Sequence, residues 1–272
     1  MEKLEFIKMH GLGNDFVIVD LRKQKISIDE NIVKKISDRR TGAGCDQIIT
    51  IDHSLSNEVD GKIKIYNATG DQAEACGNGT RCVASIFFSE LNKNNVILES
   101  VAGKLKAKLN NDGNISVNMG TVKENWSDIP LIRNMDTKNI PLNIKNFSKG
   151  FAINIGNPHI VFFGENIQNI DLENIGPKIE NHIFFPKKIN VEFVEVINNK
   201  LIKMRVWERG VGETLACGSG ACASVYAGFK KKLLDNSCEV ALKKGSLFIN
   251  IVSREIVMTG PAEISYYGNI II

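Results

Sequence analysis

Apolar and polar residues alternate along much of the chain, and this pattern predicts many short strands. In the first half, the β-rich runs are residues 16–19, 48–51, 63–66, 104–109 and 115–119. In the second half, similar runs occupy residues 160–163, 191–196, 202–207, 247–251 and 255–258. The turn signal Asn110-Asn111-Asp112-Gly113 predicts a β-hairpin between the last two runs of the first half. We therefore expect mostly antiparallel or mixed β-sheet.

Two helices are expected to interrupt the strands in each half. Ile28, Ile32, Val33 and Ile36 have the spacing of an amphipathic helix. After Gly79, apolar residues at positions 83, 86, 87, 88 and 91 fall on several sides of a second helix, which is typical of an enclosed helix. The simplest arrangement is a sheet wrapped around a central helix, formed twice.

The same motifs recur in the same order, and at a nearly constant spacing, in both halves of the chain. The matched pairs are Asn14 with Asn157, Gln47 with Asn190, Cys76 with Cys217, and Gly103 with Gly245. We infer a tandem duplication, and hence an α+β fold of two pseudo-symmetric domains. The N-terminal domain is predicted to contain residues 1–120 plus 262–272, and the C-terminal domain residues 121–261. The tail from Glu263 has no counterpart in the first half, and we expect it to add a strand there.

Composition narrows the class of protein. The 272 residues are 43% hydrophobic and 24% charged, as in an ordinary globular protein, and the net charge of +3 implies neither a nucleic-acid nor a membrane partner. The first residues lack the apolar core of a secretory signal, and no apolar run approaches the roughly 20 residues of a membrane span. A cytoplasmic location with six reduced cysteines is therefore expected.

The strongest candidate chemistry lies in a repeated cysteine motif. Residues 75–82 read Ala-Cys-Gly-Asn-Gly-Thr-Arg-Cys, and residues 216–222 read Ala-Cys-Gly-Ser-Gly-Ala-Cys. Each first cysteine opens a glycine-containing turn that leads into a helical pattern. The positive end of a helix dipole is expected to lower the thiol pKa from its ordinary value, and the unpaired N–H groups there can bind a carboxylate.

Two such thiols, one from each half, suggest an isomerase. One thiolate would remove a proton from an α-carbon, and the other thiol would return a proton on the opposite face. Backbone N–H donors would stabilise the carbanion, so we expect neither a metal nor another cofactor.

Other roles for the cysteines remain open. Cys45, Cys82, Cys222 and Cys238 are expected to be packing residues, since a buried cysteine often acts as a small hydrophobe. A thiol- or zinc-binding protein is a rival of a different class, but Cys-x5-Cys and Cys-x4-Cys are not usual zinc spacings. A pure binding module is a further rival, and it would tolerate Cys→Ser changes.

The most specific segments resemble diaminopimelate epimerase, and the resemblance extends over the whole chain. These segments are Lys8-Met9-His10-Gly11-Leu12-Gly13-Asn14-Asp15-Phe16, both cysteine motifs, Gly156-Asn157-Pro158-His159, Trp207-Glu208-Arg209-Gly210 and Gly212-Glu213-Thr214. The resemblance implies cofactor-independent conversion of LL- to meso-diaminopimelate, for lysine and peptidoglycan precursor synthesis, and it suggests a homodimer. A proline racemase-like enzyme of the same fold is the alternative.

The resemblance also implies roles for individual residues. Cys76 and Cys217 would be the acid/base pair, and His159 with Glu208 would tune the ionisation of the thiols. Arg209 would hold the distal carboxylate through a bidentate contact. The remaining substrate contacts would come from Asn14, Gln47, Asn67, Gly77, Asn78, Asn157, Asn190, Glu208, Gly218 and Ser219. The turn after Asn67 departs from the family by reading Ala68-Thr69-Gly70, which affects the loop alone.

Overall fold

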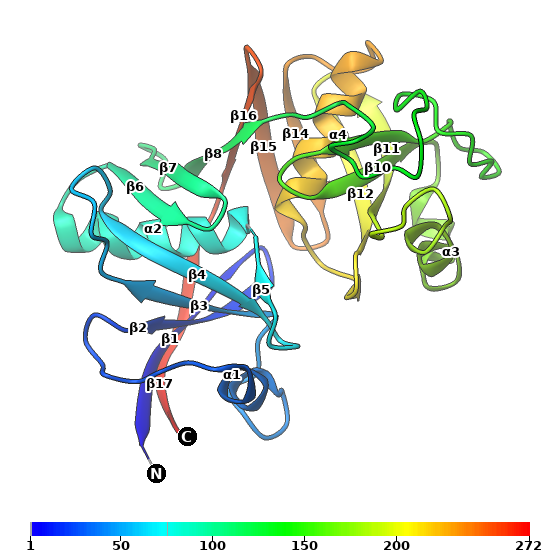
Figure 1. Cartoon of the computed structure of the whole chain (residues 1–272). Coiled ribbons are helices and arrows are strands. Elements are labelled where there is room, and N and C mark those ends of the chain that lie inside the picture. The colour runs from blue at the N-terminus through cyan, green and yellow to red at the C-terminus, as the bar shows by residue number, and fades with distance from the viewer. Residues whose placement is uncertain (1, 75) are drawn as a thin grey trace. The chain divides into compact units, whose positions relative to one another are not determined.

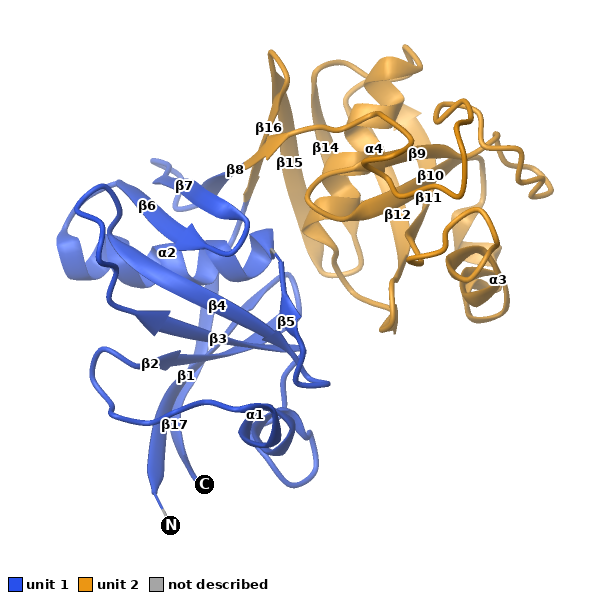
Figure 2. Ribbon diagram, in the orientation of Figure 1, with its two compact units in different colours: residues 1–118, 260–272 blue, residues 119–259 orange. Residues whose placement is uncertain are grey.

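A computed structural model describes residues 2–74 and 76–272 of the chain. The chain divides into two units, coloured separately in Figure 2: residues 1–118 with 260–272, and residues 119–259. Ala75, which opens the first cysteine motif, lies outside the described residues. The division into domains at residues 120 and 261 stays a prediction.

The first unit is built on a mixed sheet (Figure 1). Its strands are β1 (Lys3–Gly11), β2 (Asn14–Asp20), β3 (Gln47–Asp52), β4 (Gly61–Asn67), β5 (Gln72–Ala73), β6 (Asn95–Ser100), β7 (Gly103–Leu109), β8 (Ile115–Thr121) and β17 (Glu263–Ile271). Hydrogen bonding gives the order β17-β1-β2-β3-β4-β6-β7-β8, with β5 beside β4. The pairs β2–β3 and β4–β6 are parallel, and the others are antiparallel. The C-terminal tail thus adds the expected strand to this unit.

The second unit repeats this topology. Its strands are β9 (Phe151–Asn154), β10 (Pro158–Phe163), β11 (Asn190–Asn198), β12 (Leu201–Glu208), β13 (Gly212–Glu213), β14 (Ser237–Leu242), β15 (Gly245–Val252) and β16 (Glu255–Gly260). The order is β9-β10-β11-β12-β14-β15-β16, with β13 beside β12 and parallel pairs β10–β11 and β12–β14. Each pair has the direction of its counterpart in the first unit, as a tandem duplication predicts.

One apolar helix is enclosed by each sheet. In the first unit α2 (Gly77–Leu91) contacts β1 and β2 near one end of the strand order and β6 and β7 near the other, so the sheet curves around it. Gly61 of β4 lets Phe87 of α2 pack close, because a Cβ at Gly61 would lie 2.4 Å from the ring. In the second unit α4 (Gly218–Lys230) contacts strands from β9 to β15 in the same way.

The outer helices are amphipathic and carry side-chain caps. Asp29 caps α1 (Glu30–Ser37) by accepting the Ile32 N–H, and Asp171 caps α3 (Leu172–Glu180) by accepting the Asn174 N–H. The second unit also has a short 3-10 helix, η1 (Ile167–Asn169). None of the helices in the described part of the chain is both long and apolar enough to cross a membrane.

Each strand run predicted from the sequence lies inside an observed strand, and the predicted hairpin joins β7 to β8. The sequence pattern missed β1, β6, β9 and β14, and also the two-residue strands β5 and β13. In β1 the apolar alternation is interrupted by Lys8, which is 7% exposed and lies 2.6 Å from the Asp15 carboxylate of β2. A buried lysine on a strand requires such a partner, and that partner is visible only in the fold.

Candidate active site

Both candidate thiols lie at the N-terminus of an enclosed helix, as predicted. Cys76 is the N-cap of α2, and Cys217 is the N-cap of α4; both have extended backbone conformations. Gly79 and Gly220 donate their N–H groups to the respective sulfur atoms, each over 3.4 Å. The first turn of each helix therefore directs backbone donors towards a thiol.

Gly79 and Gly220 are closely packed against side chains of neighbouring strands. A Cβ at Gly79 would lie 2.5 Å from Ile49 Cδ1, and one at Gly220 would lie 2.8 Å from Glu192 Oε1. Both distances are too short for a real Cβ contact. Gly77 and Gly218, the first residues of the two helices, are buried.

An amide cluster surrounds Cys76. Its sulfur lies 3.8 Å from Asn14 Oδ1, which also accepts a hydrogen bond from Asn78 Nδ2 over 3.2 Å. Asn14 in turn donates from Nδ2 to Asp46 Oδ2 over 2.9 Å. Asp46 thereby fixes which end of the Asn14 amide faces the thiol. Asp46 was not singled out from the sequence, since its only signal was its position beside Gln47.

Gln47 and Asn67 form a second polar pair in the first unit. They face each other across the antiparallel strands β3 and β4, and Gln47 Nε2 donates to Asn67 Oδ1 over 2.9 Å. Asn67 Nδ2 donates to Asp71 Oδ2 over 2.7 Å. The strand register thus brings together two of the predicted substrate contacts.

Cys217 is buried and lies near two carboxylates, in addition to its position at a helix N-terminus. It is 4% exposed, and its sulfur lies 3.6 Å from the Ser219 hydroxyl. Burial raises the pKa of the Cys217 thiol well above its ordinary value, and the charges of Glu208 and Glu192 raise that pKa further. The expectation that the helix terminus lowers the thiol pKa is therefore wrong for Cys217. Desolvation and two carboxylates outweigh the N–H donor of Gly220.

His159 contacts a carboxylate that the sequence analysis did not single out. Its Nδ1 lies 2.7 Å from Glu192 Oε1, and its Nε2 lies 2.7 Å from Asn157 Oδ1. His159 and Glu192 are both fully buried. The available signal was a charged residue inside the apolar run Val191-Glu192-Phe193-Val194.

The remaining predicted residues lie around the end of β12. Asn190 accepts the backbone N–H of Arg209 over 2.9 Å and donates to the Pro158 carbonyl over 2.9 Å. Glu208 accepts a hydrogen bond from the Thr214 hydroxyl. The Arg209 side chain is exposed and reaches the Lys187 carbonyl at 3.4 Å. Asn190 thus ties the Arg209 loop to the strand that carries His159.

No three His, Cys, Asp or Glu side chains gather as metal ligands would within residues 2–74 and 76–272. The described geometry offers instead two helix N-termini with thiols, amide side chains and a buried His–Glu pair. Such groups suit proton transfer to and from a polar small molecule.

Comparison with solved structures shows how widely this fold occurs. A PhzF-family phenazine biosynthesis protein from Bacillus anthracis matches with a TM-score of 0.71 and 14% identity, over all of both chains. A hydroxyproline epimerase from Agrobacterium vitis matches with a TM-score of 0.69 and 10% identity, over 98% of this chain and 92% of that one. At these identities the likeness concerns the fold alone, and it confirms the expected two-part α+β architecture.

Sequence comparison is more specific. The family described as "Diaminopimelate epimerase" matches residues 6–124 and 151–265. A diaminopimelate epimerase from Pelagibacter ubique is 44% identical over 264 residues, covering 95% of each chain. One from Carboxydothermus hydrogenoformans is 44% identical over 272 residues, covering 97% of this chain and 98% of its own. On these matches, the chain belongs to the diaminopimelate epimerase family.

Proposed function

We propose that this protein interconverts LL- and meso-2,6-diaminopimelate, using Cys76 and Cys217 as the two acid/base groups. The main support for the proposal is the pair of thiols. Each is the N-cap of an enclosed helix, and the two occupy matched positions of the duplicated fold. A one-carbon inversion needs two groups of this kind, one for each face of the carbon.

The proposed reaction moves two protons and requires no redox step. One sulfur, as thiolate, takes the α-proton, and the C–H electron pair stays on carbon as a carbanion. The other sulfur gives its proton to the opposite face of that carbon and becomes the thiolate. The protein ends with one thiol and one thiolate, as it began, and the reverse reaction exchanges their roles.

Backbone donors are proposed to hold the reacting α-carboxylate. Gly77 with Asn78, and Gly218 with Ser219, open the helices α2 and α4, where N–H groups lack intrahelical partners. The same donors stabilise the charge that develops on the carboxylate as the carbanion forms.

The distal end of the substrate is also charged. The exposed guanidinium of Arg209 has the geometry for a bidentate contact with the second carboxylate. Asn14, Gln47, Asn67, Asn157 and Asn190 offer the donors and acceptors that an amino acid zwitterion needs. A proline racemase would have no use for a cation at this point, which favours a substrate with two charged ends.

Incubation of the purified protein with LL-diaminopimelate in deuterated water tests the proposal. We expect meso-diaminopimelate that carries one deuteron at a single α-carbon, formed without an added cofactor. Proline supplied under the same conditions is the matched control and is expected to remain unlabelled. Label in proline but not in diaminopimelate would contradict the proposal and favour the proline racemase-like alternative.

The protein is further proposed to act as a homodimer that pairs through β17. Among the described strands of its unit, β17 is hydrogen-bonded to β1 alone, so one edge of β17 is open. Ile264, Tyr266 and Tyr267 of this strand are 48%, 46% and 71% exposed. An open edge with exposed aromatic residues is a template for pairing, and two-fold symmetry would set one β17 against another.

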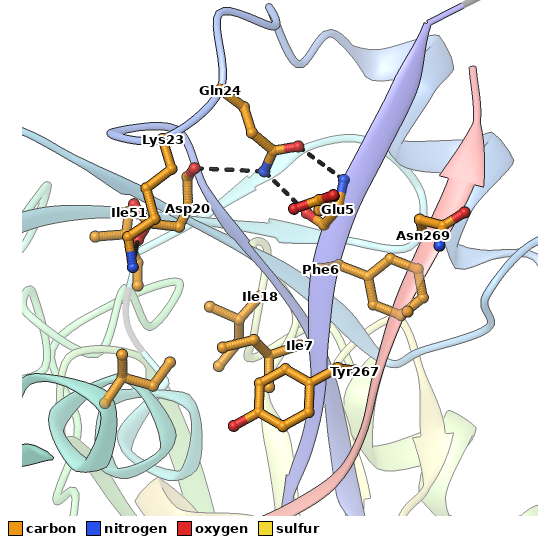
Figure 3. A pocket seen from close by; sticks show the side chains of 12 residues that line it. Glu5, Phe6, Ile7, Ile18, Asp20, Lys23, Gln24, Ile51, Tyr267 and Asn269 are labelled. Atoms are coloured by element: carbon orange, nitrogen blue, oxygen red, sulfur yellow. Dashed lines mark hydrogen bonds and ion pairs between the residues drawn. The ribbon is translucent and has the colours of Figure 1, made fainter.

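A hollow of about 430 Å³ lies beside this strand. Figure 3 shows Tyr267 next to Ile7 and Ile18, which belong to its apolar lining, and Gln24 bonded to the backbone of Glu5 at its rim. Tyr267 is both exposed and part of the lining of this hollow, which also contains the charged residues Glu5, Asp20 and Lys23. In the proposed two-fold dimer, Tyr267 of each copy would contact the hollow of the other.

The dimer is tested by replacing Tyr267 with aspartate and measuring mass by sedimentation equilibrium. We expect the wild type at twice the mass of one chain and Tyr267→Asp at the mass of one chain. Leu55→Asp, at a fully exposed loop position, should remain dimeric. A monomeric wild type, or a dimeric Tyr267→Asp protein, would contradict the proposed interface.

The cytoplasm is the proposed location, because the mechanism needs reduced thiols. All six cysteines are free. The cytosol keeps thiols reduced, whereas an oxidising compartment converts close pairs to disulfides.

A further inference from the structure

The two thiols occupy matched positions of the duplicated fold, but the turns that follow them pack against different side chains. In the first unit, the turn after Cys76 packs on apolar side chains: a Cβ at Gly79 would lie 2.5 Å from Ile49 and 3.3 Å from the ring of Phe16. Both side chains are fully buried. Ile49 and Phe16 therefore place no ionisable group against the turn that follows Cys76.

In the second unit, the corresponding surface is ionisable. A Cβ at Gly220 would lie 2.8 Å from Glu192 Oε1 and 3.3 Å from Cys217 Sγ, so the carboxylate and the thiol border the same small space. His159 bonds that same oxygen of Glu192 through Nδ1. The turn after Cys217 thus packs on a buried carboxylate–imidazole pair.

Strand register confirms that these positions correspond. Phe16 faces Gln47 across the parallel strands β2 and β3, and His159 faces Asn190 across the parallel strands β10 and β11. Ile49 and Glu192 each lie two residues further along the second strand of their pair. The duplication therefore matches Phe16 and Ile49 with His159 and Glu192.

Burying the His159–Glu192 pair costs free energy, because both side chains lose their contact with water. The presence of the pair therefore needs an explanation. Burial raises the pKa of Glu192, and the contact with His159 opposes that rise. Glu192 Oε2 is buried and has no hydrogen-bond partner among the described residues. An apolar pair, like the one beneath Cys76, would fill the same position without this cost.

We propose that Glu192 is a positioning residue that makes the two thiols unequal: it orients His159 and keeps Cys217 in the proton-holding form in the resting protein. The charged groups that face Cys217 are Glu192 from β11 and Glu208 from the end of β12, and His159 from β10 faces Glu192. A negative charge beside a buried thiol opposes its ionisation. Cys217 is then ready to donate, and the matched thiol Cys76 is the first acceptor.

This inference rests on the proposed function for its catalytic meaning but not for its test. In the proposed reaction Cys217 gives its proton to the carbanion, and the S–H electron pair stays on sulfur. Glu192 gains and loses no atom in that step; its charge favours the return of a proton to Cys217 afterwards.

The test measures alkylation of each cysteine by iodoacetamide as a function of pH, by peptide mass spectrometry and without substrate. In Glu192→Gln, the midpoint of the Cys217 profile is expected to fall by about one pH unit, which is a roughly tenfold gain in thiolate below both midpoints. The Cys76 midpoint should not move. A change in access alone would alter the limiting rate of alkylation and leave the midpoint in place.

Matched variants complete the design. Glu195→Gln removes a charge from the same strand, away from the thiol, and should leave both midpoints unchanged. Glu192→Ile places at this position the residue of the first unit, and is expected to lower the Cys217 midpoint even if the glutamine variant folds poorly. Glu192→Asp, which restores the charge, should move the midpoint back towards the wild type.

An unchanged Cys217 midpoint in both Glu192→Gln and Glu192→Ile would overturn the inference, whatever the activity of the protein. Failure of the wild type to label diaminopimelate would instead overturn the proposed function and leave the alkylation result to stand. Where activity is present, the basic limb of kcat/KM should shift to lower pH in Glu192→Gln, in the direction that uses Cys217 as the donor.

Discussion

Replacing Cys76 or Cys217 with alanine is expected to lower the rate of LL- to meso-diaminopimelate conversion by about 10²- to 10⁴-fold. Each change removes one of the two groups that transfer a proton, and no other thiol lies at the N-cap of α2 or α4. The measurement is isomer separation by chiral chromatography after timed incubation. Both variants should retain the fold, because the loss of one helix cap costs only about 0.5–2 kcal/mol of unfolding free energy.

A two-base mechanism makes a further, more specific prediction for these variants. The remaining thiol can still exchange the α-hydrogen of the isomer whose hydrogen faces it, and it must return hydrogen to the same face. We therefore expect slow deuterium exchange without inversion, confined to one isomer for Cys76→Ala and to the other for Cys217→Ala. Exchange with inversion in either variant would rule out the assignment of one thiol to each face.

Cys82 and Cys222 provide the matched controls, because they lie further along the same helices and are fully buried. Cys82→Ala and Cys222→Ala remove the same side chain from α2 and α4 without touching the caps. Their conversion rates should stay within a few-fold of the wild type, with some loss of stability from the lost volume. Equal losses of activity in caps and controls would indicate a packing role for all four cysteines.

The largest effect on stability is expected from Phe193→Ala in the core of the second unit. Phe193 is fully buried, stacks on Phe162 with ring centroids 5.5 Å apart, and meets Phe147 edge-on at 5.1 Å. Removing a buried phenylalanine side chain costs about 3–5 kcal/mol of unfolding free energy. That is a large fraction of the roughly 5–15 kcal/mol of a typical domain.

Tryptophan fluorescence during urea unfolding measures this effect in one unit. The chain has two tryptophans, Trp126 and Trp207, and both pack against the hydrophobic cluster that contains Phe193. Phe248→Ala in β15 is the control, because that ring is 45% exposed and its loss should cost far less. A midpoint for Phe193→Ala equal to that of the control would show that the cluster does not carry the stability of the unit.

The fold was largely predictable because its signals are local. Alternating apolar residues located strands such as β4 and β12, and the glycine turn after each cysteine located the N-terminus of an enclosed helix. The recurrence of both patterns in the same order predicted two units of one topology. Strand β1 was missed because its apolar alternation contains Lys8, which is explained only by the ion pair with Asp15.

The polar surroundings of the thiols were predictable only in part. Asn14 and Asn157 were expected as substrate contacts at matched positions of the repeat. Their contacts with Cys76 and with His159 were not predicted and come from the structure. Glu192 was not anticipated as the partner of His159, because strand pairing, and not sequence distance, brings β10 and β11 together. Asp46 reaches Asn14 through the pairing of β2 with β3 for the same reason.

The sequence by itself determined the duplicated plan, the two thiols at helix N-termini and the membership of a family, since all three follow from short stretches of chain. Only the tertiary structure decided how readily Cys217 loses its proton. That property depends on how much water the fold removes from the sulfur, and on which carboxylates distant segments bring beside it. Local sequence specifies neither, because desolvation and charge act through space and not along the chain.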